Sequence, residues 1–593
     1  MSGKVLRGLL VVMLAALLAA CAAAPAAAPA ATGDEGSAAK AAEQGLRVIE
    51  LADWNTAFRL NPYQFGSGGA AGLMWMRMVG MNDKFEPVDT PMALAESWEF
   101  NEDRTSVTVK LKEGLTFSDG TPITAEEAAW SLGYLIMTGH PDLKIKFSGS
   151  SAPRYWSTLK GAQDVFDGKV PADEFGAAMV EGIKVIDEST IQLDFTQPTM
   201  TLTVEPLQFW MIVKPESVMA GAGKEYGPDA YWTTEPGVVS SGPFMLESFE
   251  SGSRFSMAPN PNWAGKQPEL SRIVVNLMTD FSTALSAFEN QEADAVLMSL
   301  GPTDAQAAES SEFLKSSLQP AVGYDLEHLL ISAFKPMEDV HVRRAIAMAI
   351  DKQALVDVLG GGAGQTGYTA LDYHHIPNAV PTCNEQFASV QPLKFDPEAA
   401  RAELAKSPYA DQLADMEINM TLGMFGEPVA MNLVLAQVVQ KMLQDNLGLN
   451  NVVIHQEPMA DYTKPTYSTH LWPNSQGEHT MDVYSYMNNL VPLSAPLPED
   501  ESQMTMLTLP YVPELVEKMK EAGAQTDPVK VCEKLAEAQQ LWVDNVFTLD
   551  LLAGTTYRLQ APWVQNLNLY GPARPSISQL AGQDIAETYL LER

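Results

Sequence analysis

The sequence predicts an α/β protein, and three observations support this class. Strand-like and helical segments alternate, for example in the order strand, helix, strand over residues 418–422, 431–447 and 451–455. That order is typical of an α/β lobe with a right-handed crossover. Apolar residues make up 46% of the chain and charged residues 19%, which suits a protein with large buried cores. At 593 residues, the chain is long enough for several domains.

The first 44 residues read as a leader and a tether. Basic residues precede an apolar run over residues 9–20, which is shorter than the ~20 residues of a membrane-spanning helix and is typical of a secretory signal. Leu-Ala-Ala before Cys21 resembles a bacterial lipobox. We therefore expect a lipoprotein signal peptide over residues 1–20, lipidation of Cys21 and a flexible Ala/Pro-rich tether over residues 21–44. A plain signal peptide with an incidental Cys is the alternative.

The folded body begins with a predicted strand over residues 46–51. Residues 71–81 are rich in Leu, Met and Trp and predict a helix whose Met side chains fill a core. Residues 94–100 and 106–111 alternate as the two strands of a β-hairpin do.

Residues 117–132 carry the firmest local signals in the chain. Asp119-Gly120 marks a turn, because Gly adopts positive φ without a steric cost. Thr124 is a helix N-cap, and Glu127 three residues later completes a capping box. We expect a strand, a tight turn and a capped helix in that order.

The remaining elements follow the same patterns. An amphipathic helix is predicted over residues 341–359, with its apolar residues on one face. The other expected strands are 183–186, 190–195, 273–278, 295–298, 548–552 and 555–559, and the other expected helices are 282–290, 397–406, 513–523 and 529–543.

Charge and motifs exclude several kinds of function. A formal net charge of −36 repels phosphate backbones, so we expect no nucleic-acid partner. Residues 362–367 match G-x-G-x-x-G but follow a helix rather than a strand, and Tyr368 stands where a phosphate loop needs Lys. The pair His374-His375 lacks further ligands at metal-binding spacing. We therefore expect no cofactor, no metal and no catalytic residue. Because carboxylate pairs cannot be excluded by counting, a secreted acidic hydrolase is the alternative of another class.

Two cysteines remain once Cys21 is set aside. In an exported protein Cys383 and Cys532 could pair or remain buried free thiols, and the sequence leaves both alternatives open.

Four stretches together resemble the extracytoplasmic solute-binding proteins of bacterial ABC importers, specifically the peptide/nickel-binding family (family 5). These stretches are residues 94–132, 241–296, 341–364 and 534–567. The resemblance runs in order from about residue 46 to residue 570. It implies a two-lobed periplasmic-binding-protein-like α/β fold with a hinge, closing on a solute that is passed to a membrane permease.

The resemblance also implies a domain layout with an extra domain inserted in the first lobe. Lobe I takes residues 45–88, 201–300 and 546–593. The inserted domain takes residues 89–200, and lobe II takes residues 301–545.

The solute-contacting residues are expected from both lobes. Peptide-binding members carry a cleft-lining segment that matches residues 481–496 here, and in some members a late Asp of that segment pairs with the peptide's amino terminus. Here Tyr486, Asn488 and Asn489 fall at those later positions, and Asn offers no charge-assisted bond. Exposed aromatic side chains near loops suit either a peptide or a sugar. The other ligand contacts that we expect are Trp54, Phe65, Ser67 and Trp472.

The resemblance and the lipobox together predict a monomeric, lipid-anchored substrate-binding component of an ABC importer. It is expected in the periplasm or on the outer face of the cytoplasmic membrane, with a peptide-like solute. An oligosaccharide is the alternative within the same family, because Asn amides and Trp rings suit a neutral solute.

Overall fold

The computed structural model forms two units, residues 1–39 and 40–593, and the residues that it describes all lie in the second. No helix among them is long and apolar enough to cross a membrane. The described residues are 43–51, 60, 70–81, 87–143, 152–172, 180–198, 210–221, 238–250, 252–278, 281–300, 308, 311–359, 368–371, 383–424, 430–458, 468–476, 483–484, 487, 509–567 and 585–592.

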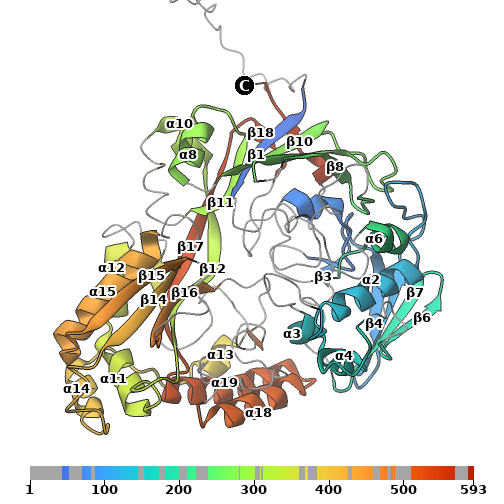
Figure 1. The fold of residues 1–593 in the computed structure, drawn as a ribbon. Helices are drawn as coiled ribbons and strands as arrows, with labels where there is room; N and C mark the ends of the chain where they lie inside the picture. The colour runs from blue at the N-terminus through green and yellow to red at the C-terminus, as the bar shows by residue number, and fades with distance from the viewer. Residues whose placement is uncertain are drawn as a thin grey trace, which may run out of the picture. The chain divides into compact units, whose positions relative to one another are not determined.

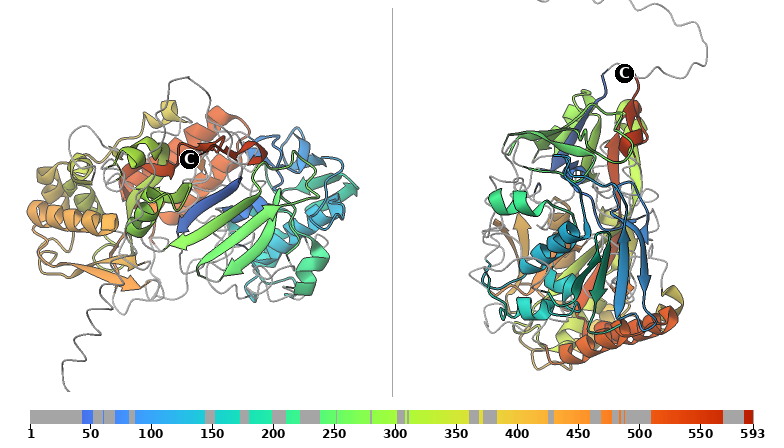
Figure 2. Two further views of the ribbon diagram at one scale, coloured as in Figure 1. Left: turned by 90° about the horizontal axis from the view of Figure 1, so that it is seen from above. Right: turned by 90° about the vertical axis from the view of Figure 1, so that its right-hand side faces the viewer.

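A mixed eleven-stranded sheet runs through the second unit (Figure 1). The strands that pair in parallel are β1 with β10 and β11, and β14 with β15 and β16. Figure 2 shows β1, β10 and β9 side by side. In spatial order the strands are β15 (Val452–Pro458), β14 (Ile418–Met424), β16 (Leu471–Gln476), β12 (Leu318–Ile331), β17 (Thr548–Gln560), β11 (Ala295–Leu300), β1 (Gly45–Leu51), β10 (Arg272–Met278), β9 (Arg254–Pro259) and β8 (Phe244–Glu250), and β13 (Tyr368–Ala370) also pairs with β17.

One hydrophobic core packs on the β1, β8–β11 part of this sheet and continues into a second sheet of four strands. The order of the smaller sheet is β4 (Ala95–Phe100), β5 (Ser106–Leu111), β7 (Thr190–Asp194), β6 (Ile183–Asp187). The structure thus confirms the predicted hairpin and the predicted strand pair. We call the hydrophobic core that packs on both of these sheets the first core.

Helix α2 (Ala125–Met137) packs against the smaller sheet and begins as predicted. The Thr124 hydroxyl accepts a hydrogen bond from the Glu126 N–H, and the Thr124 N–H donates to Glu127 Oε2 at 2.9 Å. The capping box is therefore confirmed, and the buried face of the helix carries Ala128, Ala129 and Leu132.

Two further cores lie on opposite faces of the main sheet at β12, and the second of them also packs on β14 and β16. Leu329 and Ile331 of β12 pack in the second core, whereas Leu326 packs in the third. Because strand side chains alternate between faces, these two cores lie on the two sides of β12. The helices of the second core are α11 (Val340–Ala349), α12 (Lys352–Leu359), α14 (Pro397–Leu404) and α15 (Ala430–Leu447), and those of the third are α13 (Asn384–Phe387), α18 (Val512–Gly523) and α19 (Pro528–Asn545).

Cys383 and Cys532 form a disulfide in the structure, with Cα atoms 5.0 Å apart. Cys383 is the N-cap residue of α13, and Cys532 lies in the second turn of α19. The bond ties these two helices of the third core together.

Two sequence predictions of helices differ from the structure. Residues 341–359 form two helices, because the chain turns extended at Ile350 and Asp351 Oδ1 accepts the N–H of Ala354 to start α12. The predicted helix over residues 71–81 is wrong, because only η2 (Ala70–Met74), a 3₁₀ turn, is helical there. The chain after it forms an isolated bridge at Arg77, bends at Met78 and Val79, and ends in the short strand β2 (Gly80–Met81).

β12 and β17 are the two strands that run from the first core to the other two cores. First-core residues extend to Leu314 and resume at Leu559, whereas the other two cores draw on residues 326–553. Each of the two strands therefore runs on from one set of packed residues into the other, and the predicted domain boundaries stay a prediction.

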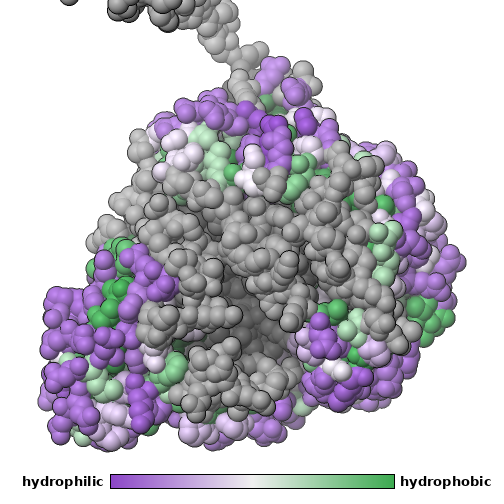
Figure 3. Space-filling model, viewed as in Figure 1, coloured by the Kyte–Doolittle hydropathy of each residue, from purple (hydrophilic) through white to green (hydrophobic). Residues whose placement is uncertain are grey.

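The described surface is largely hydrophilic over α14, α15 and the smaller sheet (Figure 3). An apolar patch lies over the edge strand β6, where Val185 and Ile186 are 40% and 55% exposed. A hydrophilic surface of this kind accommodates the net charge of −36.

Candidate functional site

Of the seven predicted ligand contacts, only Trp472 lies within the described residues. The other six, together with the lipidation candidate Cys21, lie outside the described residues and stay predictions. These six are Trp54, Phe65, Ser67, Tyr486, Asn488 and Asn489.

Trp472 lies on β16, directly opposite Leu330 of β12. Residues paired across two strands share a face of the sheet, and Leu330 packs against the third core. The half-buried Trp472 indole is therefore on the third-core face, the side of the sheet that carries α13, α18 and α19.

His470 holds the start of β16 in place. Its ring Nδ1 accepts the N–H of Asn419 at 2.9 Å, so its Nε2 carries the proton and donates to the Lys335 carbonyl at 2.9 Å. Burial lowers the pKa of His470, although the hydrogen bond to Lys335 opposes this shift. The neutral ring thus links β14 to β16 two residues before Trp472.

A row of polar residues crosses the same face next to Trp472. His328 of β12 pairs with Asn474 of β16 on one side and with Asp550 of β17 on the other. His328 is fully buried and Asp550 is nearly so. This row could have been found from the sequence, because Leu326, His328 and Leu330 alternate with residues of the other face, but no strand is predicted over residues 318–331.

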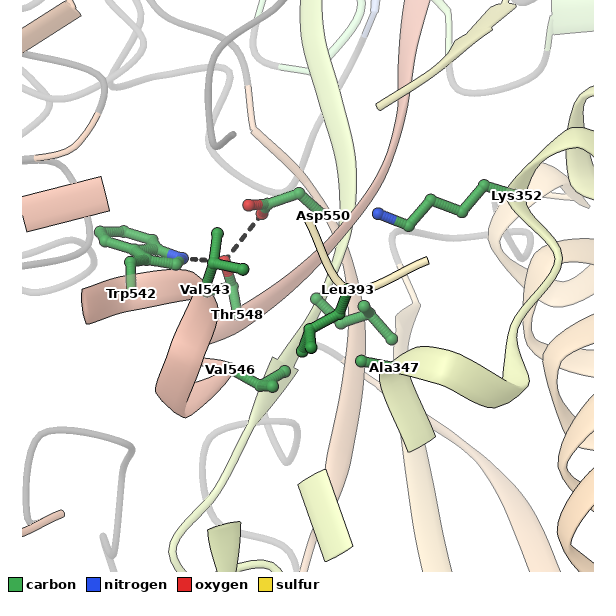
Figure 4. Close-up of a pocket in the computed structure, with 9 residues that line it drawn as sticks. Ala347, Lys352, Leu393, Trp542, Val543, Val546, Thr548 and Asp550 are labelled. Carbon is green, nitrogen blue, oxygen red and sulfur yellow. Dashed lines mark hydrogen bonds between the residues drawn. The ribbon is translucent and has the colours of Figure 1, made fainter. Parts of the chain in front are cut away.

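A small pocket of about 30 Å³ is lined in part by Asp550 (Figure 4). The Trp542 indole N–H donates to the Thr548 hydroxyl at 2.9 Å, and that hydroxyl donates to Asp550 Oδ1 at 2.7 Å. Lys352 reaches toward β17 from α12 and donates to the Leu371 carbonyl at 2.6 Å. Since these polar groups are bonded within the protein, we interpret the pocket as a packing feature between the second and third cores and not as the solute site. It is lined by Ala347, Lys352, Leu393, Trp542, Val543, Val546, Thr548, Leu549 and Asp550.

Three described residues of the predicted ligand segment, residues 481–496, are fixed in the third core. Val483, Tyr484 and Met487 are buried there with Trp542. A Cβ on Gly523 would lie 2.8 Å from the Tyr484 hydroxyl, so the absence of a side chain at Gly523 makes room for this ring. The segment is therefore anchored on the sheet face that carries Trp472.

No cluster of three or more potential metal ligands occurs within the described ranges. Within the described residues, the candidate site consists of the Trp472 side chain beside the polar row of His328, Asn474 and Asp550. Side chains of this kind can contact a solute by stacking and hydrogen bonding.

The family model for bacterial extracellular solute-binding proteins, family 5 Middle, matches residues 90–498. Among curated proteins, the chain is 25% identical to heme-binding protein A of Haemophilus influenzae over 54% of each chain. It is 26% identical to a probable ABC transporter-binding protein of Deinococcus radiodurans over 62% of this chain and 60% of that protein. The chain therefore spans about half to three fifths of the length of these relatives. A longer match, at 21% identity, covers 93% of this chain and 94% of the oligopeptide-binding protein OppA of Bacillus subtilis.

Solved structures share the fold over almost the whole chain. The murein tripeptide binding protein MppA of Escherichia coli has a TM-score of 0.72 at 16% identity and covers 94% of this chain and 100% of its own. Haemophilus influenzae OppA, solved with the peptide RPPGFSPFR, has a TM-score of 0.70 at 16% identity and covers 93% and 100%. These likenesses confirm the predicted two-lobed α/β fold. Since the family model covers more than half of the residues, the chain belongs to the bacterial extracellular solute-binding proteins of family 5.

Proposed function

We propose that this chain is the lipid-anchored, monomeric substrate-binding component of an ABC importer. It captures a peptide-like solute by closure of two lobes and delivers it to the membrane permease. Family membership supports a binding role, and relatives named for dipeptides and oligopeptides support a peptide as the solute. Anchoring at Cys21 would hold the folded body at the outer face of the cytoplasmic membrane, where a permease is within reach.

The observation that carries the proposal is the separation of the cores along β12 and β17. The register of this strand pair shifts between Ala321 and Asp325, which lie opposite Thr556 and Gly554. This irregularity falls between the last first-core residue before β12, Leu314, and the first third-core residue on it, Leu326. A break in the ladder between two packed bodies suits a hinge, because bending there disturbs neither core.

On this proposal, lobe I is the first core, including the inserted domain at residues 89–200, and lobe II is the second and third cores. Solute binding shifts the open–closed equilibrium only by the difference in its affinity for the two states. Trp472, Tyr486, Asn488 and Asn489 would contribute from lobe II. Trp54, Phe65 and Ser67 would contribute from lobe I.

A thermal-denaturation screen against peptides and oligosaccharides tests the function. A peptide present at 100 times its Kd should stabilise the protein by about 2.7 kcal/mol and be recovered unchanged. Stabilisation by oligosaccharides alone would replace the peptide with a sugar. Cleavage of a stabilising compound would replace binding with hydrolysis.

The Asn489→Asp substitution tests the peptide orientation. An added carboxylate at this position should strengthen binding of peptides with a free amino terminus by about 1–2 kcal/mol, because an ionic hydrogen bond replaces a neutral one. N-acetylated peptides are the matched control and should gain nothing. Equal effects on both peptide forms would contradict a role for residue 489 in amine recognition, and the measurement is calorimetric titration.

A further inference from the structure

Among the described residues, Arg77, Arg343 and Arg558 are almost fully buried, and the surroundings of Arg77 and Arg343 differ. Arg343 of α11 is 1% exposed and Arg77 is 4% exposed. The Arg343 guanidinium donates to the carbonyls of Asn545 at 2.8 Å, Met337 at 2.8 Å and Glu338 at 3.0 Å. Arg343 is therefore a structural cation whose donors are used within the protein.

Arg77 lies in the segment between η2 and β2, where the sequence predicts a helix. Its backbone N–H donates to Met92 O at 3.1 Å, and the segment pairs with Ala93 on one side and Met211 on the other. Side chains of bridge partners share a face of a sheet. Both bridge partners of Arg77, Ala93 and Met211, are apolar and buried, so neither supplies a counter-charge.

Across the described residues, the Arg77 Nε finds no hydrogen-bond acceptor and no carboxylate pairs with its guanidinium. Burial lowers the pKa of Arg77 to about 10, which leaves the side chain charged at neutral pH. A second unsatisfied group lies on the neighbouring chain segment. The Thr90 hydroxyl is buried without a hydrogen-bond partner among these residues, in the space left by Gly80, and the Thr90 carbonyl accepts the N–H of Ala93.

A buried cation without a partner costs several kcal/mol, and an anion that forms two parallel hydrogen bonds with a guanidinium offsets this cost. We propose that Arg77 is a solute-recognition residue that binds a carboxylate or phosphate group of the transported solute. This inference deepens the proposed function and rests on it. It makes the solute an anion-bearing compound and places the anion beside the segment that follows the predicted contacts Phe65 and Ser67.

The test compares wild type with Arg77→Met, which removes the charge and keeps much of the side-chain volume. Calorimetric titration uses Ala-Glu-Ala, its C-terminal amide and the amide of Ala-Gln-Ala, which together remove the carboxylates one at a time. Wild type should bind Ala-Glu-Ala or its C-terminal amide about 10- to 100-fold more tightly than the compound that lacks one more carboxylate. We call this factor the carboxylate ratio. Arg77→Met should reduce the carboxylate ratio to near one, and Arg77→Lys should retain part of it.

Arg254→Met is the matched control, because Arg254 is exposed and pairs with Glu250 at 2.7 Å. It removes the same charge from the surface and should leave the carboxylate ratio unchanged. A carboxylate ratio that Arg77→Met leaves at its wild-type value would overturn the inference.

Thermal stability separates recognition from a structural role. Without solute, Arg77→Met should keep or raise Tm, because it removes an unpartnered buried charge, whereas Arg343→Met should lower Tm strongly. A fall in Tm for Arg77→Met comparable with that of Arg343→Met would overturn the inference.

Failure of the proposed peptide function and failure of the Arg77 inference give different results. If no peptide binds wild type, the proposed peptide function fails, and citrate and inorganic phosphate then test Arg77 directly. Stabilisation of wild type but not of Arg77→Met by either anion supports the inference. Absence of that difference overturns it.

Discussion

At the scale of single residues, Trp472 is the predicted ligand contact that the structure positions. It is half-buried on the sheet face that also anchors Val483 and Met487 of the predicted ligand segment. Residue types and local spacing were enough to predict the Thr124–Glu127 capping box, whereas the ligand contact at Trp472 stays a prediction.

Trp472→Ala should weaken solute binding by roughly tenfold or more, because stacked aromatic area is lost. Trp472→Phe should retain most of the affinity. Trp542→Phe is the matched control, since Trp542 is buried in the third core and donates to Thr548, so its loss should lower stability and not affinity. Titration of a stabilising peptide measures the affinities, and an unchanged Trp472→Ala affinity would place the solute elsewhere.

His470 predicts a pH dependence of stability. Its folded-state pKa lies below the ordinary value of 6.5, so the unfolded chain binds the proton more readily. The contribution is fully present above pH 6.5 and is lost as pH falls through that value toward the folded-state pKa. The cause of the lowered pKa is burial of the ring.

Urea unfolding at pH 7.5, 6.5 and 5.5 measures this effect. Wild type should lose stability over this range, and His470→Gln should lose less. Replacing the half-buried His455 by Gln should leave the dependence in place, because His470 remains. Equal slopes for wild type and His470→Gln would contradict the assignment.

Arg77 shows why some residues could not be identified from sequence. Residues 71–81 consist mainly of good helix formers, but the backbone donors of Arg77 and Met78 bond Met92 and Trp210, far along the chain. Pairing with distant segments therefore overrides local propensity. Once the segment is read as a helix, nothing in the sequence marks Arg77 as buried.

At the scale of elements, turn and capping residues predicted where helices and strands begin and end. They did not predict which strands run on without a break. The hairpin over residues 95–111 and α2 follow from alternation and capping. The long strand β12 was missed, and β17 was predicted as two shorter strands although it is continuous. Strands that pass between cores change their buried face at register shifts, so a simple period of two is lost.

The disulfide between α13 and α19 gives a prediction at this scale. It joins residues 149 positions apart, for which the chain-entropy relation gives about 4–5 kcal/mol of stabilisation. Cys532→Ser should therefore lower the free energy of unfolding by several kcal/mol, and a reductant should do the same to wild type. Urea unfolding with and without reductant measures both, and a Cys532→Ser protein that is equally stable and insensitive to reductant would contradict the account.

At the scale of the whole molecule, the class and family could be predicted because several separated stretches agree in order. Domain boundaries were harder to predict from the sequence. The first core draws on both ends of the folded body, and the exchange of residues between cores occurs inside β12 and β17 rather than in a Pro/Gly-rich linker. The identity of the solute is harder still to predict, because solute specificity depends on a few side chains and not on the fold.

The central claim, that solute binding closes two lobes about β12 and β17, is tested most directly by a distance measurement. Ile186 lies on β6 of the first-core side and Val358 on α12 of the second core, and they are 55% and 52% exposed. Spin labels on Ile186→Cys and Val358→Cys report the distance between the lobes by pulsed electron resonance. Labels on Val358→Cys and Phe395→Cys, both on the second-core side, serve as the control.

The account predicts that a stabilising peptide shifts the Ile186–Val358 distance distribution and leaves the control pair unchanged. A distribution that saturating peptide does not change would contradict closure about this hinge.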